Sequence, residues 1–277
     1  MNNSFSFNRL WLLLKKDFVE NSKMMLLGAF GLFGMLTLTY VLIPYWSFRN
    51  IVTPIFLTTG CGIAASLMFT QLRTKQGRIS NFMLPATTFE KYLEQFLVYV
   101  VGFVLLFFAC GYAAELVRCI VAPVIWGETG EDFLKLSEFN NPFAIMTAGI
   151  DSQREALEEV FYNDALDSFI EVRAWLLAFF VVGTLFTQAL FALAATLWPK
   201  FSYLKMYVLT QVFSMVLTIV MVPIMEFLTK YYAQHLEDFV EMLLFDGCQW
   251  MYLAAYAVIA IVLFVASYVV YKRKDVC

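Results

Sequence analysis

The chain has 277 residues, of which 61% are hydrophobic, 18% aromatic and only 15% charged, with a formal net charge of −3. Soluble globular domains average about 45–50% apolar and about 25% charged residues, so this composition excludes an ordinary soluble domain. Five cysteines, an odd number without regular spacing, exclude a disulfide-stapled secreted domain. The class that remains is an all-α polytopic membrane protein, with residues 1–277 forming a single transmembrane domain.

Residues 5–20 predict an amphipathic helix ahead of the first membrane span. Apolar side chains recur there at intervals of three and four residues, which places one stripe along an α-helix: Phe7, Leu10, Trp11, Leu14 and Phe18. We expect this helix to lie along the cytoplasmic lipid headgroups. It would serve either as a generic membrane anchor or as a mechanical elbow helix.

Six stretches without charged residues or His are long enough to cross a bilayer, which takes about 20 apolar residues. Trimmed by turn signals, they predict spans at residues 24–44, 51–71, 96–121, 174–197, 204–228 and 250–271. Thr53-Pro54 has the residue types that begin a helix and is expected to open the second span. Small residues are expected to let helices approach closely in the first two spans: Gly28, Gly31, Gly34, Gly60 and Ala64.

The distribution of Lys and Arg predicts the orientation. If the N-terminus is cytoplasmic, 13 of the 19 basic residues fall on the inner side, which then carries a net charge of +8 against −11 outside. This asymmetry follows the positive-inside rule, so both termini are predicted to be cytoplasmic. Trp198 at a predicted inner boundary, with Trp126 and Trp250 at outer ones, fits the interfacial preference of indole rings.

Residues 72–95 form the longest predicted cytoplasmic loop, which we interpret as a docking surface for a cytoplasmic partner. A basic cluster precedes an apolar patch: Arg73, Lys75 and Arg78, then Phe82, Met83, Leu84 and Pro85. An exposed apolar patch beside charges is typical of protein interfaces. The alternative is a solvated loop with a helix cap. Thr87-Thr88-Phe89-Glu90 has the spacing of a capping box, which predicts a new helix from Thr87 or Thr88 into the third span.

Residues 122–173 form a strongly acidic region on the predicted outer side. Ser152-Gln153-Arg154-Glu155 has the spacing of a second capping box, which predicts an extracytoplasmic helix. A second acidic outer stretch is predicted at residues 229–249. The default interpretation of both is a solvated acidic surface.

The predicted spans contain little that could drive transport or catalysis. Their central portions carry no ionisable residue, and Glu115 and Arg118 lie one helical turn apart toward the outer end of the third span. No Gly-Lys dipeptide exists, so the chain has no P-loop, and the single histidine, His235, lies in a predicted outer loop. We therefore expect neither an enzyme nor a metal site, and any ATP hydrolysis must come from another chain.

Four polar side chains at membrane depth are candidates for a transport path or a subunit interface: Thr187, Gln188, Gln211 and Ser214. Structural hydrogen bonding between helices is the alternative role for them.

The order of these features resembles the permease subunits of ABC transporters, in the type-two exporter class with six spans per subunit. The residues that carry the resemblance are the stretch RLWLLLKKDF before the first span and the loop RTKQGRISNFMLPATTFEKYL. Members of that class have an interfacial elbow helix and a first cytoplasmic loop that docks in a cleft of the ATPase subunit. The resemblance implies that the coupling region comprises Arg73, Lys75, Arg78, Leu84, Pro85, Glu90 and Lys91. The largest outer segment lies between spans three and four here, whereas many members have it between spans five and six.

The resemblance thus implies a permease subunit of an ATP-driven exporter in a bacterial cytoplasmic (inner) membrane. It would pair with a second permease subunit as a homodimer or heterodimer and contact membrane lipids and a cytoplasmic ATP-binding subunit. No cofactor is expected in this chain, since ATP-Mg would bind the partner, and no nucleic-acid partner is expected. The rival hypothesis is a membrane scaffold or anchor that recruits a cytoplasmic partner and transports nothing.

Overall fold

A computed structural model describes residues 5–43, 46–127, 136–142, 165–198, 200–245 and 248–276, and these residues form helices and connecting turns without any strand. The chain divides into two compact units. The first unit comprises Met1–Ala64 and Leu84–Arg173, and the second comprises Ala65–Met83 and Ala174–Cys277.

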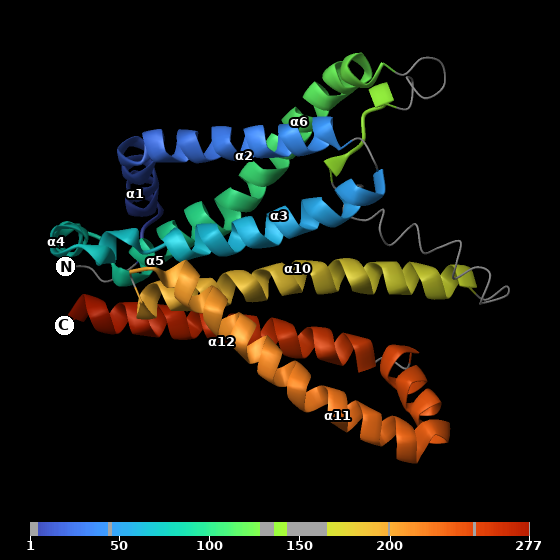
Figure 1. Ribbon diagram of the computed structural model, residues 1–277. Helices are drawn as coiled ribbons and strands as arrows, with labels where there is room; N and C mark the ends of the chain where they lie inside the picture. The colour runs from blue at the N-terminus through green and yellow to red at the C-terminus, as the bar shows by residue number, and fades with distance from the viewer. Residues whose placement is uncertain are drawn as a thin grey trace. The chain divides into compact units, whose positions relative to one another are not determined.

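The first unit begins with the amphipathic helix that the sequence predicts. Helix α1 (Phe7–Glu20) is followed after one residue by α2 (Ser22–Leu42), and α1 runs across the end of α2 (Figure 1). The hinge residue Asn21 is held by α1, because its backbone N–H donates to Asp17 O at 2.9 Å and its side-chain Nδ2 donates to Asp17 Oδ1 at 3.1 Å. The elbow between α1 and α2 is therefore hydrogen-bonded on both its backbone and its side chain.

A long composite helix completes the first unit. It consists of α5 (Thr88–Phe96), a π-helical stretch η2 (Leu97–Gly102) and α6 (Phe103–Trp126), and α2 packs along α6. It ends at Gly127, which has a φ of 61° and donates its N–H to Pro123 O. Glycine adopts this left-handed conformation without steric cost, and it is the usual helix terminator.

Helix α3 (Trp46–Leu67) corrects the predicted start of the second span. The helix begins several residues before Thr53-Pro54, so Pro54 lies inside it rather than at its first turn. Thr53 does not cap the helix but shares a hydrogen bond of 3.0 Å with the hydroxyl of Tyr40 on α2, and both side chains are fully buried. A buried tertiary contact has therefore overridden the local helix-start signal.

The prediction about small residues holds at one glycine only. A Cβ added to Gly60 would lie 2.6 Å from the ring of Phe103, so α3 and α6 approach closely there. A Cβ at Gly28, Gly31 or Gly34 would meet nothing within 4 Å, so the prediction of close approach at these three positions is wrong within the described structure.

The second unit contains the short helices η1 (Thr70–Arg73, 3₁₀) and α4 (Lys75–Met83). It also contains α11 (Ser202–Phe245), α12 (Cys248–Val276) and, from Ala174 onward, α10 (Ala165–Leu197). A small apolar core joins α3, α10 and α11 through Ala65, Phe191, Ala194 and Met206. Aromatic contacts join α10 to α12, because the rings of Phe179 and Phe186 both meet Tyr256 edge-on.

Five helices of the described chain are long and apolar enough to span a membrane: Ser22–Leu42, Thr88–Trp126, Leu177–Leu197, Ser202–Pro223 and Trp250–Lys274. The apolar part of α3, Ile51–Leu67, is shorter than these. The protein is therefore an all-α polytopic membrane protein. The capping box predicted at Ser152 lies outside the described residues, as does most of the predicted acidic outer region.

Candidate functional site

The predicted docking loop, residues 72–95, folds into two short helices, α4 in the second unit and α5 in the first. Local hydrogen bonds fix the start of α4, because Gly77 N donates to Thr74 Oγ1 at 3.0 Å and Arg78 N donates to Thr74 O at 3.1 Å. Position 77 requires glycine, because a Cβ there would lie 2.4 Å from the backbone oxygen of Gln71. The turn from η1 into α4 is therefore tight.

One side of α4 is fixed to α12. Asn81 Nδ2 donates to the hydroxyl of Tyr271 at 2.9 Å, and both residues are buried. The ring of Phe69 stacks on Tyr271 with the ring centroids 4.8 Å apart. Tyr271 therefore anchors α4. The sequence alone could not reveal this contact, because Asn81 lies 190 positions away from Tyr271.

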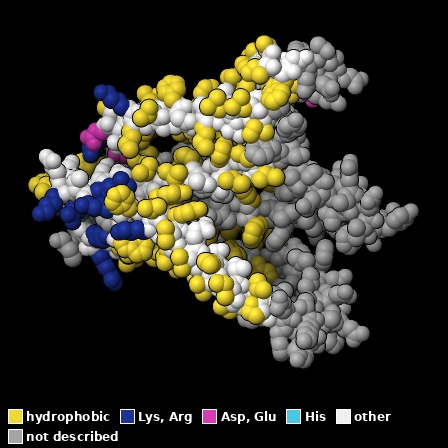
Figure 2. Space-filling view, in the orientation of Figure 1, with side chains coloured by type: hydrophobic (Ala, Val, Ile, Leu, Met, Phe, Trp, Pro, Cys, Tyr) yellow, Lys and Arg dark blue, Asp and Glu magenta, His cyan; other side chains and the backbone are white. Residues whose placement is uncertain are grey.

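The remaining surface of α4 is exposed and mixes positive charge with apolar side chains. Lys75 and Arg78 are exposed, and the side chains of Ile79 and Met83 are 58% and 79% exposed. We call these four residues the α4 surface. In the space-filling view, Lys and Arg side chains gather around α4 and the C-terminal end of α12 (Figure 2). The predicted docking residue Phe82 lies on α4, but its side chain is outside the described part of the structure.

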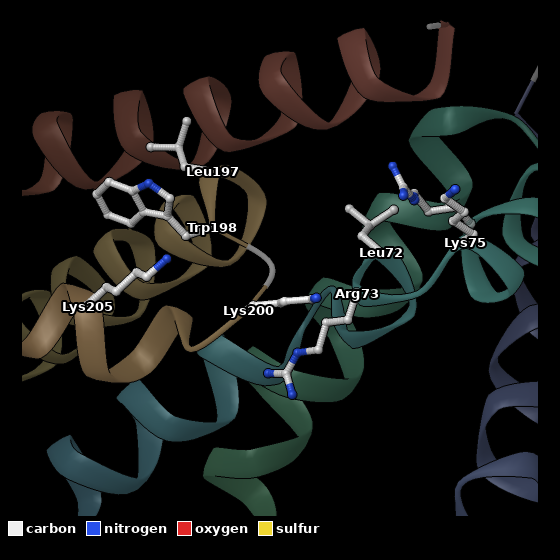
Figure 3. Close-up of a pocket in the computed structure, with 8 residues that line it drawn as sticks. Leu72, Arg73, Lys75, Leu197, Trp198, Lys200 and Lys205 are labelled. Carbon is white, nitrogen blue, oxygen red and sulfur yellow. The ribbon is translucent and has the colours of Figure 1, made fainter.

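A basic pocket of about 580 Å³ opens in the second unit, between the η1–α4 segment and the turn from α10 to α11 (Figure 3). Five of its lining residues are cationic: Arg73, Lys75, Arg78, Lys200 and Lys205. Leu72, Leu197 and Trp198 complete the lining, so none of the described residues that line the pocket is acidic. Arg73 is half-buried, and its Nε has no hydrogen-bond partner among the described residues.

The turn that carries Lys200 is held in a specific shape. Ser202 Oγ donates to Ser66 O at 3.0 Å in a buried hydrogen bond, which ties the start of α11 to the end of α3. Phe201 has a φ of 57°, a left-handed conformation that residues other than glycine seldom adopt, and its side chain is 74% exposed. Backbone strain of this kind persists only where the surroundings impose it.

The second half of the predicted loop confirms the capping box at Thr87. Glu90 N donates to Thr87 Oγ1 at 3.2 Å, and Thr87 N donates to Glu90 Oε2 at 2.8 Å. The other carboxylate oxygen of Glu90 accepts from α1, because Arg9 Nη2 and Ser6 N donate to Oε1 at 3.0 and 2.7 Å. We call this set the α1–α5 clamp.

The clamp changes the interpretation of two predicted docking residues. Glu90 is fully buried and Lys91 is only 4% exposed, so neither offers a free charge to a partner in this structure. Leu84 is half-buried and Pro85 is exposed. Of the predicted coupling region, the side chains that reach the surface are therefore Lys75, Arg78 and Pro85, with Arg73 and Leu84 partly accessible.

The apolar stripe of α1 divides between two faces. Leu10 is buried together with Leu13 and Asp17, and these three residues share the side of the helix that faces the protein. Phe7, Trp11 and Phe18 are 78%, 69% and 67% exposed and lie on an adjacent side, with the half-buried Leu14 between them. A helix with one side against protein and a neighbouring apolar side uncovered fits the expected interfacial position.

Two carboxylates meet beneath α1, and the sequence analysis missed this pair. Gln95 Nε2 donates to Glu94 Oε2 at 2.8 Å and to Asp17 Oδ2 at 3.3 Å, and all three side chains are buried. Glu94 Oε1 has no hydrogen-bond partner among the described residues. Asp17 was not singled out from the sequence, because only the packing of α1 on α5 buries it.

A buried ion network lies where α3 approaches α6. Arg118 Nε and Nη2 donate to the two oxygens of Glu115 at 2.9 and 2.8 Å, so these two residues form an ion pair. Arg49 of α3 joins them, with Nη1 3.2 Å from Glu115 Oε2, and all three side chains are at most 3% exposed. Arg49 was not identified from the sequence as a partner of Glu115, although Arg49 is the single charged residue between two long uncharged stretches.

The four polar residues predicted at membrane depth do not come together. Gln188 is buried, and the Thr187 hydroxyl donates a hydrogen bond to Gly183 O within the same helix. Gln211 and Ser214 are both exposed on α11. Gln188 is therefore buried on α10, whereas Gln211 is exposed on α11.

The described residues contain no group of three or more His, Cys, Asp or Glu side chains arranged to hold a metal ion. Comparison with protein-family models, curated proteins and solved structures finds no match to this chain.

Proposed function

We propose that this chain is the transmembrane permease subunit of an ATP-driven exporter in a bacterial inner membrane, and that a separate cytoplasmic ATPase binds its α4 surface. The observation that supports this proposal most is the exposure of Ile79 and Met83 beside Lys75 and Arg78 on a helix anchored through Asn81. An apolar centre with cations around it suits an acidic cleft on a soluble partner.

The α1–α5 clamp supports a mechanical role for α1. A force applied to α5 would pass to α1 through Glu90, which is bonded to Arg9 and Ser6 at distances of 3.2 Å or less. Helix α1 in turn continues into α2 through the hydrogen-bonded hinge at Asn21. The ATPase would thus tilt the first spans by moving the loop, and ATP-Mg would bind only on that partner.

The proposal includes six spans with both termini in the cytoplasm. Helix α3 has 22 residues, which corresponds to about 33 Å at 1.5 Å per residue and matches a hydrocarbon core of about 30 Å. Its one charged residue, Arg49, is paired with Glu115, which lowers the cost of placing it near the membrane.

We further propose that a second permease subunit covers α11. Gln211 and Ser214 lie on one face of this helix with Thr210 and Thr218, and Gln211, Ser214 and Thr218 are exposed. Polar side chains of this kind form hydrogen bonds between membrane helices. Such a dimer would build the substrate path between the two subunits.

The test is to purify the tagged full-length chain from native membranes in mild detergent and to measure Mg-ATP hydrolysis of the isolated complex. K75E/R78E reverses both charges of the α4 surface, and K272E/R273E reverses two exposed charges elsewhere on the chain as the control. We expect the ATPase activity to be lost with the first variant and kept with the second. Equal activity in both variants would refute docking at α4.

The scaffold hypothesis makes a different prediction. If the chain only recruits the ATPase, the reconstituted ATPase would hydrolyse ATP at the same rate with and without this subunit. An ATPase rate that depends on the subunit supports the exporter instead, because a permease is coupled to hydrolysis.

A further inference from the structure

We propose that the basic pocket of the second unit binds the phosphate group of an anionic membrane lipid. The inference goes beyond the proposed function, because it assigns a ligand to the pocket rather than a partner to α4. Lys75 and Arg78 belong to both sites, whereas Lys200 and Lys205 belong to the pocket alone. Either proposal can fail while the other holds.

The charge of the pocket calls for an anion. Five cationic side chains line one cavity of about 580 Å³, and no acidic residue lines it within the described chain. Like charges held this close repel one another, so an anion among them stabilises the arrangement. Arg73 also supports a bound anion, because its buried Nε is an N–H donor that lacks a hydrogen-bond acceptor among the described residues. Phosphate oxygens, like carboxylate oxygens, form strong charge-assisted hydrogen bonds with guanidinium groups, and a lipid headgroup supplies the phosphate.

The position of the pocket indicates that the phosphate belongs to a lipid. The apolar span on α10 ends at Leu197 and the span on α11 begins at Ser202, so Lys200 lies on the turn where the chain leaves the hydrocarbon core. Lipid phosphates lie at this level, and basic pockets between spans on the cytoplasmic side are typical lipid headgroup sites.

The walls of the pocket are also amphipathic in the way a lipid is. Leu72, Leu197 and Trp198 line it beside the cations, and Figure 3 shows Trp198 and Lys205 on one side with Lys200 extending toward the segment of Arg73. The apolar side chains suit the glycerol and upper acyl region of a lipid, and the indole suits the interface.

The site is built rather than accidental. Three contacts tie its walls together within the second unit: Ser202 Oγ to Ser66 O at 3.0 Å, Asn81 Nδ2 to Tyr271 Oη at 2.9 Å, and Lys274 Nζ to Thr196 O. Phe201 takes up a left-handed backbone conformation beside Lys200, and its exposed ring can enter the lipid interface next to the pocket.

The test compares lipid binding by the full-length chain and two variants in mild detergent, using native mass spectrometry with phosphatidylglycerol and with the zwitterionic phosphatidylcholine. K200Q/K205Q removes two pocket charges that lie outside the proposed ATPase-docking surface. K272Q/R273Q removes two exposed charges that do not line the pocket. K200R/K205R keeps the charge and reports on whether the site tolerates substitution.

We expect K200Q/K205Q to weaken phosphatidylglycerol binding about 30-fold, which is the factor for two cations at about 1 kcal/mol each. K200R/K205R and K272Q/R273Q should change it less than about threefold, and phosphatidylcholine should bind weakly throughout. Equal losses of phosphatidylglycerol binding in K200Q/K205Q and K272Q/R273Q would indicate a diffuse basic surface rather than a site, and would overturn the proposal. Inorganic phosphate is the second arm: if it binds without lipid and phosphatidylglycerol does not displace it, the pocket takes a soluble anion and the lipid assignment is wrong.

Discussion

Arg9 and Glu90 are 81 positions apart in the chain, yet Arg9 donates through both Nε and Nη2 to the same carboxylate oxygen of Glu90, at 3.2 and 3.0 Å. The carboxylate also closes the capping box of α5 through Thr87. One buried side chain therefore joins the amphipathic helix α1 to the start of the helix that leads into the third span.

Removing the carboxylate tests this clamp. E90A leaves the Arg9 guanidinium and the backbone N–H groups of Ser6 and Thr87 without their acceptor, so we expect a loss of about 2–4 kcal/mol in the free energy of unfolding. K16A is the control, because it breaks only the exposed Lys16–Glu20 pair and should cost less than about 0.5 kcal/mol. Denaturant unfolding in detergent measures both. Equal losses of unfolding free energy in E90A and K16A would mean that Glu90 contributes no more to stability than an exposed ion pair does.

The network of Arg49, Glu115 and Arg118 predicts an asymmetric response. E115Q leaves two buried guanidinium groups without a counter-charge and should destabilise the protein by about 3–5 kcal/mol. R49M leaves Arg118 paired with Glu115 and removes one buried charge, so its cost should be clearly smaller. Thermal unfolding of the two variants under identical conditions gives the comparison. A larger loss of stability for R49M than for E115Q would contradict the central role of Glu115 in this network.

The acidic pair under α1 predicts a stabilising substitution. Asp17 and Glu94 are both buried and share Gln95, and like charges held close together repel. E94Q keeps the shape of the side chain and removes the cost of burying a second carboxyl beside Asp17, so we expect the midpoint of thermal unfolding to rise by about 2 °C, as about 1 kcal/mol gives in a chain of this size. A fall in the midpoint would indicate that the Glu94 charge is compensated by groups other than Gln95.

Two glycines should respond in opposite ways to the same substitution. G77A places a Cβ 2.4 Å from the backbone oxygen of Gln71 and should loosen the turn into α4, at a cost of about 1–3 kcal/mol. G28A meets nothing within 4 Å and should be neutral or slightly stabilising, since alanine favours helix. Amide hydrogen exchange over α4 and α2 reports the local effect. If G77A leaves the exchange of α4 unchanged, the tight turn is not what holds this helix.

The sequence predicts those features of the fold that depend on local patterns. Five of the six apolar stretches, the amphipathic period of residues 5–20 and the capping box at Thr87 are each read within about twenty residues, and the described helices agree with them in place. The start of α3 could not be predicted, because Thr53 is recruited into a buried contact with Tyr40 instead of capping a helix.

The candidate sites depend on contacts between distant residues, and this limits what the sequence can reveal. In the sequence, Lys200 and Lys205 contribute only to the count of positive charges. They line a pocket because the α10–α11 turn lies against the η1–α4 segment. The burial of Glu90 likewise depends on Arg9. Charge patterns thus predict where positive charge gathers, and packing decides which of these charges reach the surface.

The account depends most on α4 facing the cytoplasm, and accessibility of a single cysteine tests it directly. The side chain of Met83 is 79% exposed on α4, so M83C in a variant without the five native cysteines gives one reactive position. A membrane-impermeant maleimide should label M83C in inverted inner-membrane vesicles and leave it unlabelled in intact cells. Labelling in intact cells would place α4 on the outer side, where no cytoplasmic ATPase can bind it.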